Sequence, residues 1–231
     1  MQTHANGAKS ILSRAPSATL DEHSEKVVPA LPSSEPEVVR IILSAFVADP
    51  AARWMYPEES EYQTYFLAFV RAFAGAAFLT GSAHVVGSGS GAALWLPPGN
   101  HPDDHELAGL IGRSIPAWRR GAVFSVFEEM GRYHPLDPHW HLPLIGVEPS
   151  EHRRGLGSSL LRYGLRNCDE QRLPAYLESS HPDNIPLYQR HGFEILGTIQ
   201  VDSSPPITPM LRRASACSRR RVSKLEVRRS N

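Results

Sequence analysis

The chain has 231 residues and a formal net charge of zero at neutral pH, because 24 Lys and Arg are matched by 24 Asp and Glu. This length suits one domain with tails, and a hydrophobic share of 41% is ordinary for a globular protein. No apolar run approaches the roughly 18–20 residues of a membrane span, and the N-terminus lacks the apolar core of a secretory signal, so we expect a cytoplasmic protein with no membrane partner.

Residues 1–34 are rich in Ser, Ala and Pro and show no sustained periodicity, which predicts a disordered N-terminal tail. Lys9 and Arg14 precede every acidic residue, a weak sign of a mitochondrial transit peptide, but acidic residues follow from Asp21 onward. We therefore expect the folded domain to begin at residue 35.

The first helix is predicted by the stretch SSEPEVVRIILSAFVADP, residues 33–50. Ser34 and Glu37 have the spacing of a capping box, Pro36 falls in the first turn, and Asp49-Pro50 is interpreted as the end of the helix. Apolar residues at helical spacing predict its buried side: Val38, Ile41, Ile42, Ala45 and Phe46.

Further helices and strands alternate up to residue 213. Helical periodicity predicts helices at 62–73, 103–133 with a break at 114–116, 158–172 and 184–192. Alternation and turn residues predict strands at 82–88 and 91–99, which form a hairpin, and at 139–147, 174–180, 193–201 and 207–213. Helices, a hairpin and then alternating strands and helices indicate a layered fold of the α/β (α+β) class.

The last stretch, 214–231, is basic. From Arg212 to the end, eight Arg or Lys stand against the single acid Glu226, which leaves about −7 on residues 1–211. A basic tail can contact nucleic acid or a membrane surface, but this composition is more typical of a solvated, disordered segment. We predict a disordered tail and expect no nucleic-acid partner.

A short glycine loop, HRRGLGSS, lies between the strand at 139–147 and the helix that follows. Gly155 and Gly157 allow a ligand close to the backbone, Ser158 is predicted to start the helix, and Arg153 and Arg154 add positive charge. A phosphate needs such converging backbone N–H groups. The loop is neither a Walker nor a Rossmann motif, and its spacing alone fits a plain strand-to-helix turn equally well.

Residues 149–161, PSEHRRGLGSSLL, resemble the acetyl-CoA loop of the GNAT family of N-acetyltransferases. The motif of that family wraps the CoA pyrophosphate. It consists of Gln or Arg, then any two residues, Gly, any one residue, and Gly or Ala. His152, Gly155 and Gly157 take the three defining positions, with His152 in place of the usual Gln or Arg. The resemblance implies that the loop binds the pyrophosphate through His152, Arg153, Arg154, Gly155, Leu156, Gly157 and Ser158.

A second block, residues 173–197, resembles the downstream half of the same family. There an asparagine contacts the pantetheine arm and a tyrosine protonates the departing thiolate, which implies these roles for Asn184 and Tyr188. More narrowly, both blocks are similar to puromycin N-acetyltransferase-like members. The resemblance implies a largely antiparallel central sheet flanked by helices, with a splayed pair of strands that holds acetyl-CoA.

Pro143 gives a physical hint of such a splay. A proline removes a hydrogen-bond donor from a strand and is expected only at an edge or a bulge. On the residues alone an ordinary bulge suffices. With the resemblance, the backbone of Leu144, Ile145, Gly146 and Val147 is expected to bind the pantetheine arm and to polarise the thioester carbonyl.

Acyl transfer needs a proton donor for sulfur and an acceptor for the amine proton. Tyr188 suits the donor, since an unperturbed tyrosine has a pKa near 10; its alternative is a core aromatic. Glu178 suits the base, because alternation in AYLESS places Tyr176, Glu178 and Ser180 on one strand face. A purely structural role for the Glu178 carboxylate is an equally good interpretation. In that case the amine proton could leave through ordered water.

Other polar clusters receive simpler interpretations. His134, His139 and His141 invite a zinc hypothesis, but they lack Cys partners and a metal-binding spacing, so we predict no metal. Glu128 and Glu129 could hold a cationic amine, although a solvated helix face is the favoured interpretation.

Together these features predict an acetyl-CoA-dependent N-acetyltransferase that acts directly on a primary amine of a small molecule, as a monomer or homodimer. Cys168 lies mid-helix and Cys217 in the tail, so neither is placed to carry an acyl group. The alternatives are a catalytically quiet CoA or acyl-CoA sensor on the same fold and a protein whose basic tail binds nucleic acid. The acceptor pocket is expected within 56–133.

Overall fold

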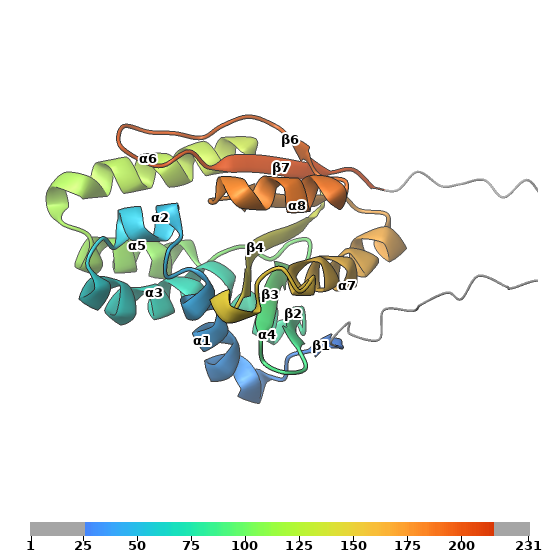
Figure 1. The fold of residues 1–231 in the computed structure, drawn as a ribbon. Helices are drawn as coiled ribbons and strands as arrows, with labels where there is room; N and C mark the ends of the chain where they lie inside the picture. The colour runs from blue at the N-terminus through green and yellow to red at the C-terminus, as the bar shows by residue number, and fades with distance from the viewer. Residues whose placement is uncertain (1–25, 215–231) are drawn as a thin grey trace, which may run out of the picture.

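A seven-stranded sheet runs through the protein in the order β1-β2-β3-β4-β5-β7-β6 (Figure 1). The structure is a computed structural model and describes residues 26–214. All neighbouring strands pair antiparallel except β4 and β5. The predicted mixed, largely antiparallel sheet is therefore confirmed.

The folded region begins earlier than predicted. Strand β1 (Val27–Pro29) lies in the stretch expected to be disordered and pairs with β2, Val27 opposite Val86. Val27 and Ala30 are buried, which explains why this short segment joins the sheet edge. The predicted boundary at residue 34 is thus wrong. The rest of the predicted tails, 1–25 and 215–231, lies outside the described residues.

Helix α1 (Glu35–Ala45) follows a 3₁₀ turn, Pro32–Ser34, and carries Pro36 in its first turn as predicted. The predicted capping box is wrong: the Ser34 side chain makes no cap hydrogen bond. Ser34 has φ −88° and ψ 1°, whereas a capping side chain needs an extended residue. The buried face of the helix includes Val38, Val39, Ile41 and Ile42, whereas Ala45 and Phe46 are only half-buried.

Helix α2 (Pro50–Met55) was not predicted, because Asp49-Pro50 was interpreted only as a helix end. The Asp49 side chain caps this second helix, accepting hydrogen bonds from the N–H groups of Ala51 and Ala52, both at 3.0 Å. Proline suits the first helical position, where its missing N–H costs nothing. The same dipeptide therefore ends one helix and starts the next.

The middle of the chain follows the predicted order. It contains α3 (Glu59–Ala74), α4 (Ala76–Leu79), the hairpin of β2 (Ala83–Val86) and β3 (Gly91–Leu96), α5 (Asp104–Ser114) and α6 (Ala117–Tyr133). The expected break near Pro116 separates α5 from α6. Only the single-turn helix α4 was absent from the predicted elements of this region.

The C-terminal part supplies β4 (Trp140–Val147), the 3₁₀ turn Pro149–Glu151, α7 (Leu156–Gln171), β5 (Ala175–Ser179), the 3₁₀ turn Pro182–Asn184, α8 (Ile185–Arg190), β6 (Glu194–Ile195) and β7 (Thr208–Arg212). The predicted strand 193–201 is mostly wrong: only β6 and an isolated bridge, Ile199 to Ile207, remain. The chain leaves the sheet there and runs beside α6 (Figure 1). Ile199 and Ile207 form a buried cluster with Val126 of α6.

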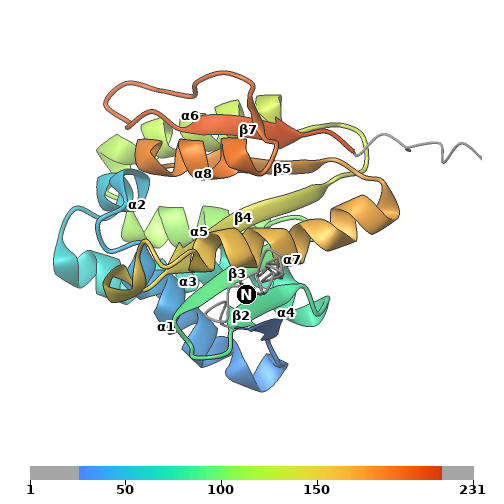
Figure 2. The ribbon, with the colours of Figure 1, turned by 45° about the vertical axis from the view of Figure 1, so that its right-hand side comes forward.

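Helices cover both faces of the sheet, each over its own core. Helices α1 to α6 bury the aromatic side chains of α3 against one face of β2, β3 and β4. On the other face, α7 and α8 pack over β3, β4, β5 and β7 (Figure 2). The approach of α7 is close, since a Cβ on Gly164 would lie 2.2 Å from Nε1 of Trp95. Within residues 26–214, no helix combines the length and apolar character required to cross a membrane.

The sheet divides between β4 and β5. These parallel strands pair only at Trp140 with Ala175 and His141 with Tyr176. On the other side of β4, Leu94 of β3 lies opposite Leu144 and Leu96 opposite His141, so the register shifts at Pro143. The expected bulge and splay are therefore present, and β4 and β5 stop pairing beyond His141.

Candidate active site

The glycine loop joins the end of β4 to the start of α7, beside the splay. Gly155 is the N-cap of α7 and has φ +81°, a left-handed conformation that glycine adopts without strain. An added Cβ there would meet no atom within 4 Å, so backbone conformation and not space favours glycine. Helix α7 begins at Leu156, two residues before the predicted start, and its first N–H groups have no partner within the helix.

The side chains of the loop mostly bind the protein itself. His152 donates from Nε2 to the carbonyl oxygen of Val147 at 3.0 Å, and Arg154 forms an ion pair with Glu151. Leu156 is buried in the core, so only its backbone can face a ligand. Arg153 is exposed and has φ +64°. The loop can therefore bind a ligand through its backbone N–H groups and the positive charge of Arg153.

Ser158 and Gly157 complete the first turn of α7. The Ser158 hydroxyl shares a 2.7 Å hydrogen bond with Nε2 of His191 and accepts one of 3.0 Å from Arg162. A Cβ on Gly157 would lie 3.4 Å from Leu187, an ordinary contact. The two predicted loop glycines therefore differ, since only Gly155 has a backbone conformation that disfavours other residues.

Along β4, residues 144–147 pair with β3 on one edge and border the splay on the other. Gly146 is needed for packing, because a Cβ there would lie 2.5 Å from the Cβ of Ala45 on α1. Leu144 also lines a cavity between α3, α6 and the splay. The backbone of β4 is thus held in place beside the opening.

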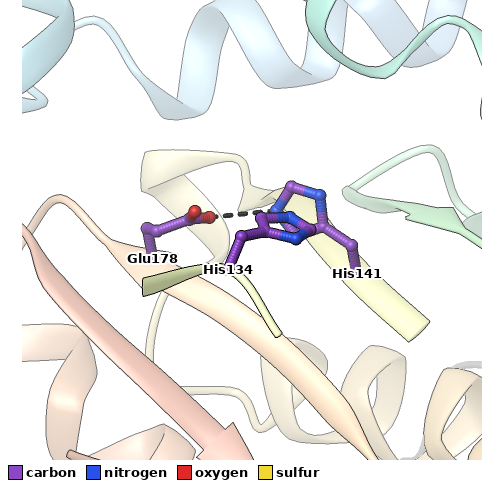
Figure 3. Close-up of side chains that lie close together, drawn as sticks. All are labelled: His134, His141 and Glu178. Atoms are coloured by element: carbon purple, nitrogen blue, oxygen red, sulfur yellow. Dashed lines mark hydrogen bonds and ion pairs between the residues drawn. The ribbon is translucent and has the colours of Figure 1, made fainter. Parts of the chain in front are cut away.

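Glu178 lies on β5 across the opening and points toward β4 (Figure 3). His141 Nε2 donates to Glu178 Oε2 at 2.9 Å, and the two side chains are only 4% and 5% exposed, respectively. Tyr176 lies two residues before Glu178; burial and the nearby Glu178 raise the pKa of its hydroxyl. This His141–Glu178 pair was not predicted from the sequence.

His134 packs beside this pair (Figure 3), with its ring centroid 4.8 Å from that of His141 and 4.7 Å from that of His139. Burial lowers the pKa of His134 to about 4, so its ring is neutral at neutral pH. The atoms that could bind a metal ion, one from each of His134, His141 and Glu178, lie within 4.8 Å of one another. His139 instead donates from Nδ1 to the Asp137 carbonyl at 2.8 Å.

Tyr188 lies on α8, 6% exposed, in the core between α7 and the sheet. Burial raises the pKa of its hydroxyl, and the negative charge of Asp49 raises it further, so Tyr188 is protonated at neutral pH. Asn184 immediately precedes α8, is exposed, and makes no cap hydrogen bond with its side chain. Both sequence-predicted residues thus lie on the same short segment.

An apolar cavity of about 710 Å³, including its open mouth, lies beside Glu178. Its apolar walls come from α1 to α3, α6, β4 and the segment before β7: Phe46, Ala51, Ala52, Trp54, Met55, Phe66, Phe69, Phe73, Val123, Val126, Phe127, Met130, Pro143, Leu144, Pro205 and Ile207. Seven of the twenty described residues that line the cavity fall in the predicted region 56–133, and the other thirteen lie outside it. Asp49, Glu178, Ser180 and Ser204 are its polar members.

Asp49 is a cavity residue that sequence reasoning missed. Its Oδ2 accepts a hydrogen bond of 2.5 Å from the Ser180 hydroxyl, and the residue is 8% exposed. Burial raises the pKa of the Asp49 carboxyl even though its hydrogen bonds with Ser180, Ala52 and Ala51 act in the opposite direction. The sequence signal that could have revealed the capping role of Asp49 is the dipeptide Asp49-Pro50, which is typical of a helix start.

Glu128 and Glu129 do not line this cavity. Both form ion pairs with Arg132 on α6, and Glu128 is 69% exposed. The favoured interpretation, a solvated helix face, agrees with this geometry, and the acceptor role considered for these two residues is not supported.

Comparison with known proteins identifies the fold and the family. The model for the acetyltransferase (GNAT) family matches residues 43–193. An uncharacterized N-acetyltransferase of Schizosaccharomyces pombe is 28% identical over 166 residues, 66% of this chain and 67% of that protein. A Corynebacterium glutamicum structure described as histone acetyltransferase HPA2 and related acetyltransferase is 25% identical, with a TM-score of 0.62, covering 84% of this chain and 99% of that one.

A polyamine N-acetyltransferase of Drosophila melanogaster, described as forming N-acetylagmatine, has a TM-score of 0.58 over 81% of this chain and 99% of its own. At 13% identity this is a likeness of fold. The matches support the acetyltransferase family, whereas none of them tests the narrower similarity to puromycin N-acetyltransferase-like members.

Proposed function

The chain belongs to the GNAT family of acetyltransferases, and on this basis we propose that it transfers an acetyl group from acetyl-CoA directly to a primary amine of a small molecule. The observation that carries the proposal is the α7 N-terminus, with Gly155 at φ +81°, beside the splay of β4 and β5. A diphosphate and a narrow acyl arm need these two features next to each other. The Drosophila neighbour described as a polyamine N-acetyltransferase also supports an amine acceptor.

In this proposal the pyrophosphate lies against the start of α7. The backbone N–H groups of residues 155–158 would donate to it, and the helix dipole favours negative charge there. Arg153 would add charge from the exposed loop. His152 would act indirectly, by its hydrogen bond to the Val147 carbonyl, which ties the loop to the end of β4.

The pantetheine arm would enter the splay along the backbone of residues 144–147, with Asn184 contacting it from the segment before α8. Support comes from the short β4–β5 pairing, which leaves that edge of β4 without a strand partner beyond His141. An N–H group on this edge can donate to the thioester carbonyl and stabilise negative charge on its oxygen during attack.

The chemical step joins the amine nitrogen to the thioester carbon and breaks the carbon–sulfur bond. Glu178 would take the proton that leaves the amine, directly or through one water molecule, and His141 holds this carboxylate by its 2.9 Å hydrogen bond. Tyr188 would give its proton to the departing sulfur. Its raised pKa supports the role of donor, because the hydroxyl remains protonated at neutral pH.

Titration calorimetry with acetyl-CoA, and separately with free CoA, tests the nucleotide site. We expect micromolar binding of both and its loss in Gly155→Glu, where the new carboxylate crowds and repels the diphosphate. Asp104→Asn, at an exposed position on α5, is a control for surface charge and should bind as the unchanged protein does. Binding that survives Gly155→Glu would place the diphosphate elsewhere, and binding without any acetyl transfer would indicate a CoA sensor.

A further inference from the structure

The cavity beside Glu178 has one acidic end and otherwise apolar walls. Among the described residues that line it, Asp49 and Glu178 carry the only ionisable side chains, and Ser180 and Ser204 add hydroxyls. The aromatic wall comes mainly from α3, where Phe66, Phe69 and Phe73 stack at centroid distances of 5.4 and 5.1 Å. Such a cavity suits a ligand with one cationic group and an apolar body.

The two carboxylates are neighbours in the fold. Ser180 lies just past the end of β5, two residues after Glu178, and donates a hydrogen bond to Asp49, and all three side chains line the same cavity. Asp49 therefore lies near the proposed base and on the cavity side of the splay. An ammonium group bound between them would bring its nitrogen to the reaction centre.

Asp49 is equipped to hold a cation. The hydrogen-bond partners of its side chain are the N–H groups of Ala51 and Ala52 and the hydroxyl of Ser180, which are all neutral. Among the described residues, His181 is the one nearby group whose positive charge would lower the pKa of Asp49, and its effect is smaller than that of these hydrogen bonds. None of the ion pairs found within residues 26–214 involves it. A carboxylate buried to this degree is stabilised when an opposite charge arrives.

We propose that the acceptor is a monoamine with a ring-sized apolar body, that its ammonium group binds Asp49, and that its apolar body packs against Phe66, Phe69 and Val126. The inference rests on the proposed function and names its substrate class. Asp49 holds the amine in its cationic form, and Glu178 then takes the proton that must leave before attack. Diamines are disfavoured, since their second ammonium group would lie among apolar side chains without a counter-charge.

The first experiment compares acceptors that differ in charge at similar length. With saturating acetyl-CoA, kcat/KM for phenethylamine should exceed that for 1,4-diaminobutane and for agmatine by about 100-fold, the order expected when a second charge enters an apolar pocket. A higher kcat/KM for either dication would overturn the inference while leaving the proposed acetyl transfer intact.

The second experiment isolates the charge of Asp49. Asparagine caps helices as well as aspartate does, so Asp49→Asn should retain the start of α2 and its thermal midpoint. We expect KM for phenethylamine to rise at least tenfold while KM for acetyl-CoA stays unchanged. Asp103→Asn makes the same change at the N-cap of α5, where the side chain accepts a hydrogen bond from the backbone N–H of Glu106, and should change neither KM.

Direct binding separates this inference from the proposed function. Calorimetry in the presence of free CoA should show phenethylamine binding at least tenfold more tightly than its neutral isostere 2-phenylethanol, and Asp49→Asn should remove that difference. If this pattern holds but no amine is acetylated, the proposed function fails and the cationic site remains. If amines are acetylated but the two ligands bind equally, the role of Asp49 is refuted.

Discussion

Replacing Tyr188 with phenylalanine tests the proposed proton donor at one atom. The residue is 6% exposed and packs within the core beneath α7, with its ring 6.2 Å from that of Phe193. Phenylalanine keeps this packing, so the free energy of unfolding should change by less than about 1 kcal/mol. Loss of a positioned general acid typically costs 10²–10⁴-fold in rate, so kcat should fall by about a thousandfold, or about 4 kcal/mol of transition-state stabilisation.

The assay is steady-state release of thiol from acetyl-CoA with a primary amine, together with calorimetry of CoA binding. CoA affinity should be unchanged in Tyr188→Phe. Tyr163→Phe serves as a matched control, because Tyr163 lies on α7, where its ring packs against His84 and Arg166. A kcat within threefold of the unchanged enzyme in Tyr188→Phe would refute the assignment, because no other residue has been given the acid's role.

Four further substitutions test the local structure. Gly155→Ala should lower the free energy of unfolding by about 1–2 kcal/mol, because alanine is strained at the left-handed φ of +81°. In Gly157→Ala the new Cβ would lie 3.4 Å from Leu187, an ordinary contact, so the free energy of unfolding should change by less than about 1 kcal/mol. Equal thermal midpoints for the two variants would contradict this distinction. Gly164→Ala places a Cβ 2.2 Å from Nε1 of Trp95 and should cost about 3 kcal/mol in chemical denaturation. Burial lowers the pKa of His84 from 6.5 to about 4, so on acidification the unfolded chain takes up this proton before the folded protein does. The free energy of unfolding should therefore fall by about 3 kcal/mol from pH 7 to pH 4. His84→Gln should reduce this dependence on pH, and an unchanged dependence in the variant would refute the role of His84.

The parts of the site that are contiguous in sequence could be predicted. The loop around Gly155 and the segment with Asn184 and Tyr188 were located by their resemblance to two blocks of the GNAT family, since the glycine and arginine spacing alone fits a plain strand-to-helix turn equally well. Pro143 gave the bulge in β4, since proline cannot complete the ladder in a central strand. At Pro143 a local rule of backbone chemistry decides the structure.

Contacts between distant segments could not be predicted. His141 and Glu178 meet because two parallel strands, separated by α7, start in register at Trp140 and Ala175. Asp49 and Ser180, far apart in the chain, meet at the cavity through a 2.5 Å hydrogen bond. No periodicity within either segment encodes these partners.

Short or irregular elements were missed for a different reason. β1 (Val27–Pro29) is too brief for alternation to show, and it forms because β2 offers it an edge. The stretch 193–201 has the apolar content of a strand, but Ile199 finds its burial against α6 instead of in the sheet. Tertiary packing, not propensity, decided both.

The most direct test of the central claim is the formation of product. Purified protein with acetyl-CoA and phenethylamine should release free CoA in equal amount to N-acetylphenethylamine, detected by mass as a gain of one acetyl group, and the release should require the amine. Thiol release that does not depend on any primary amine, or tight CoA binding without any acetylated product across a panel of amines, would contradict direct acetyl transfer as the function of this site.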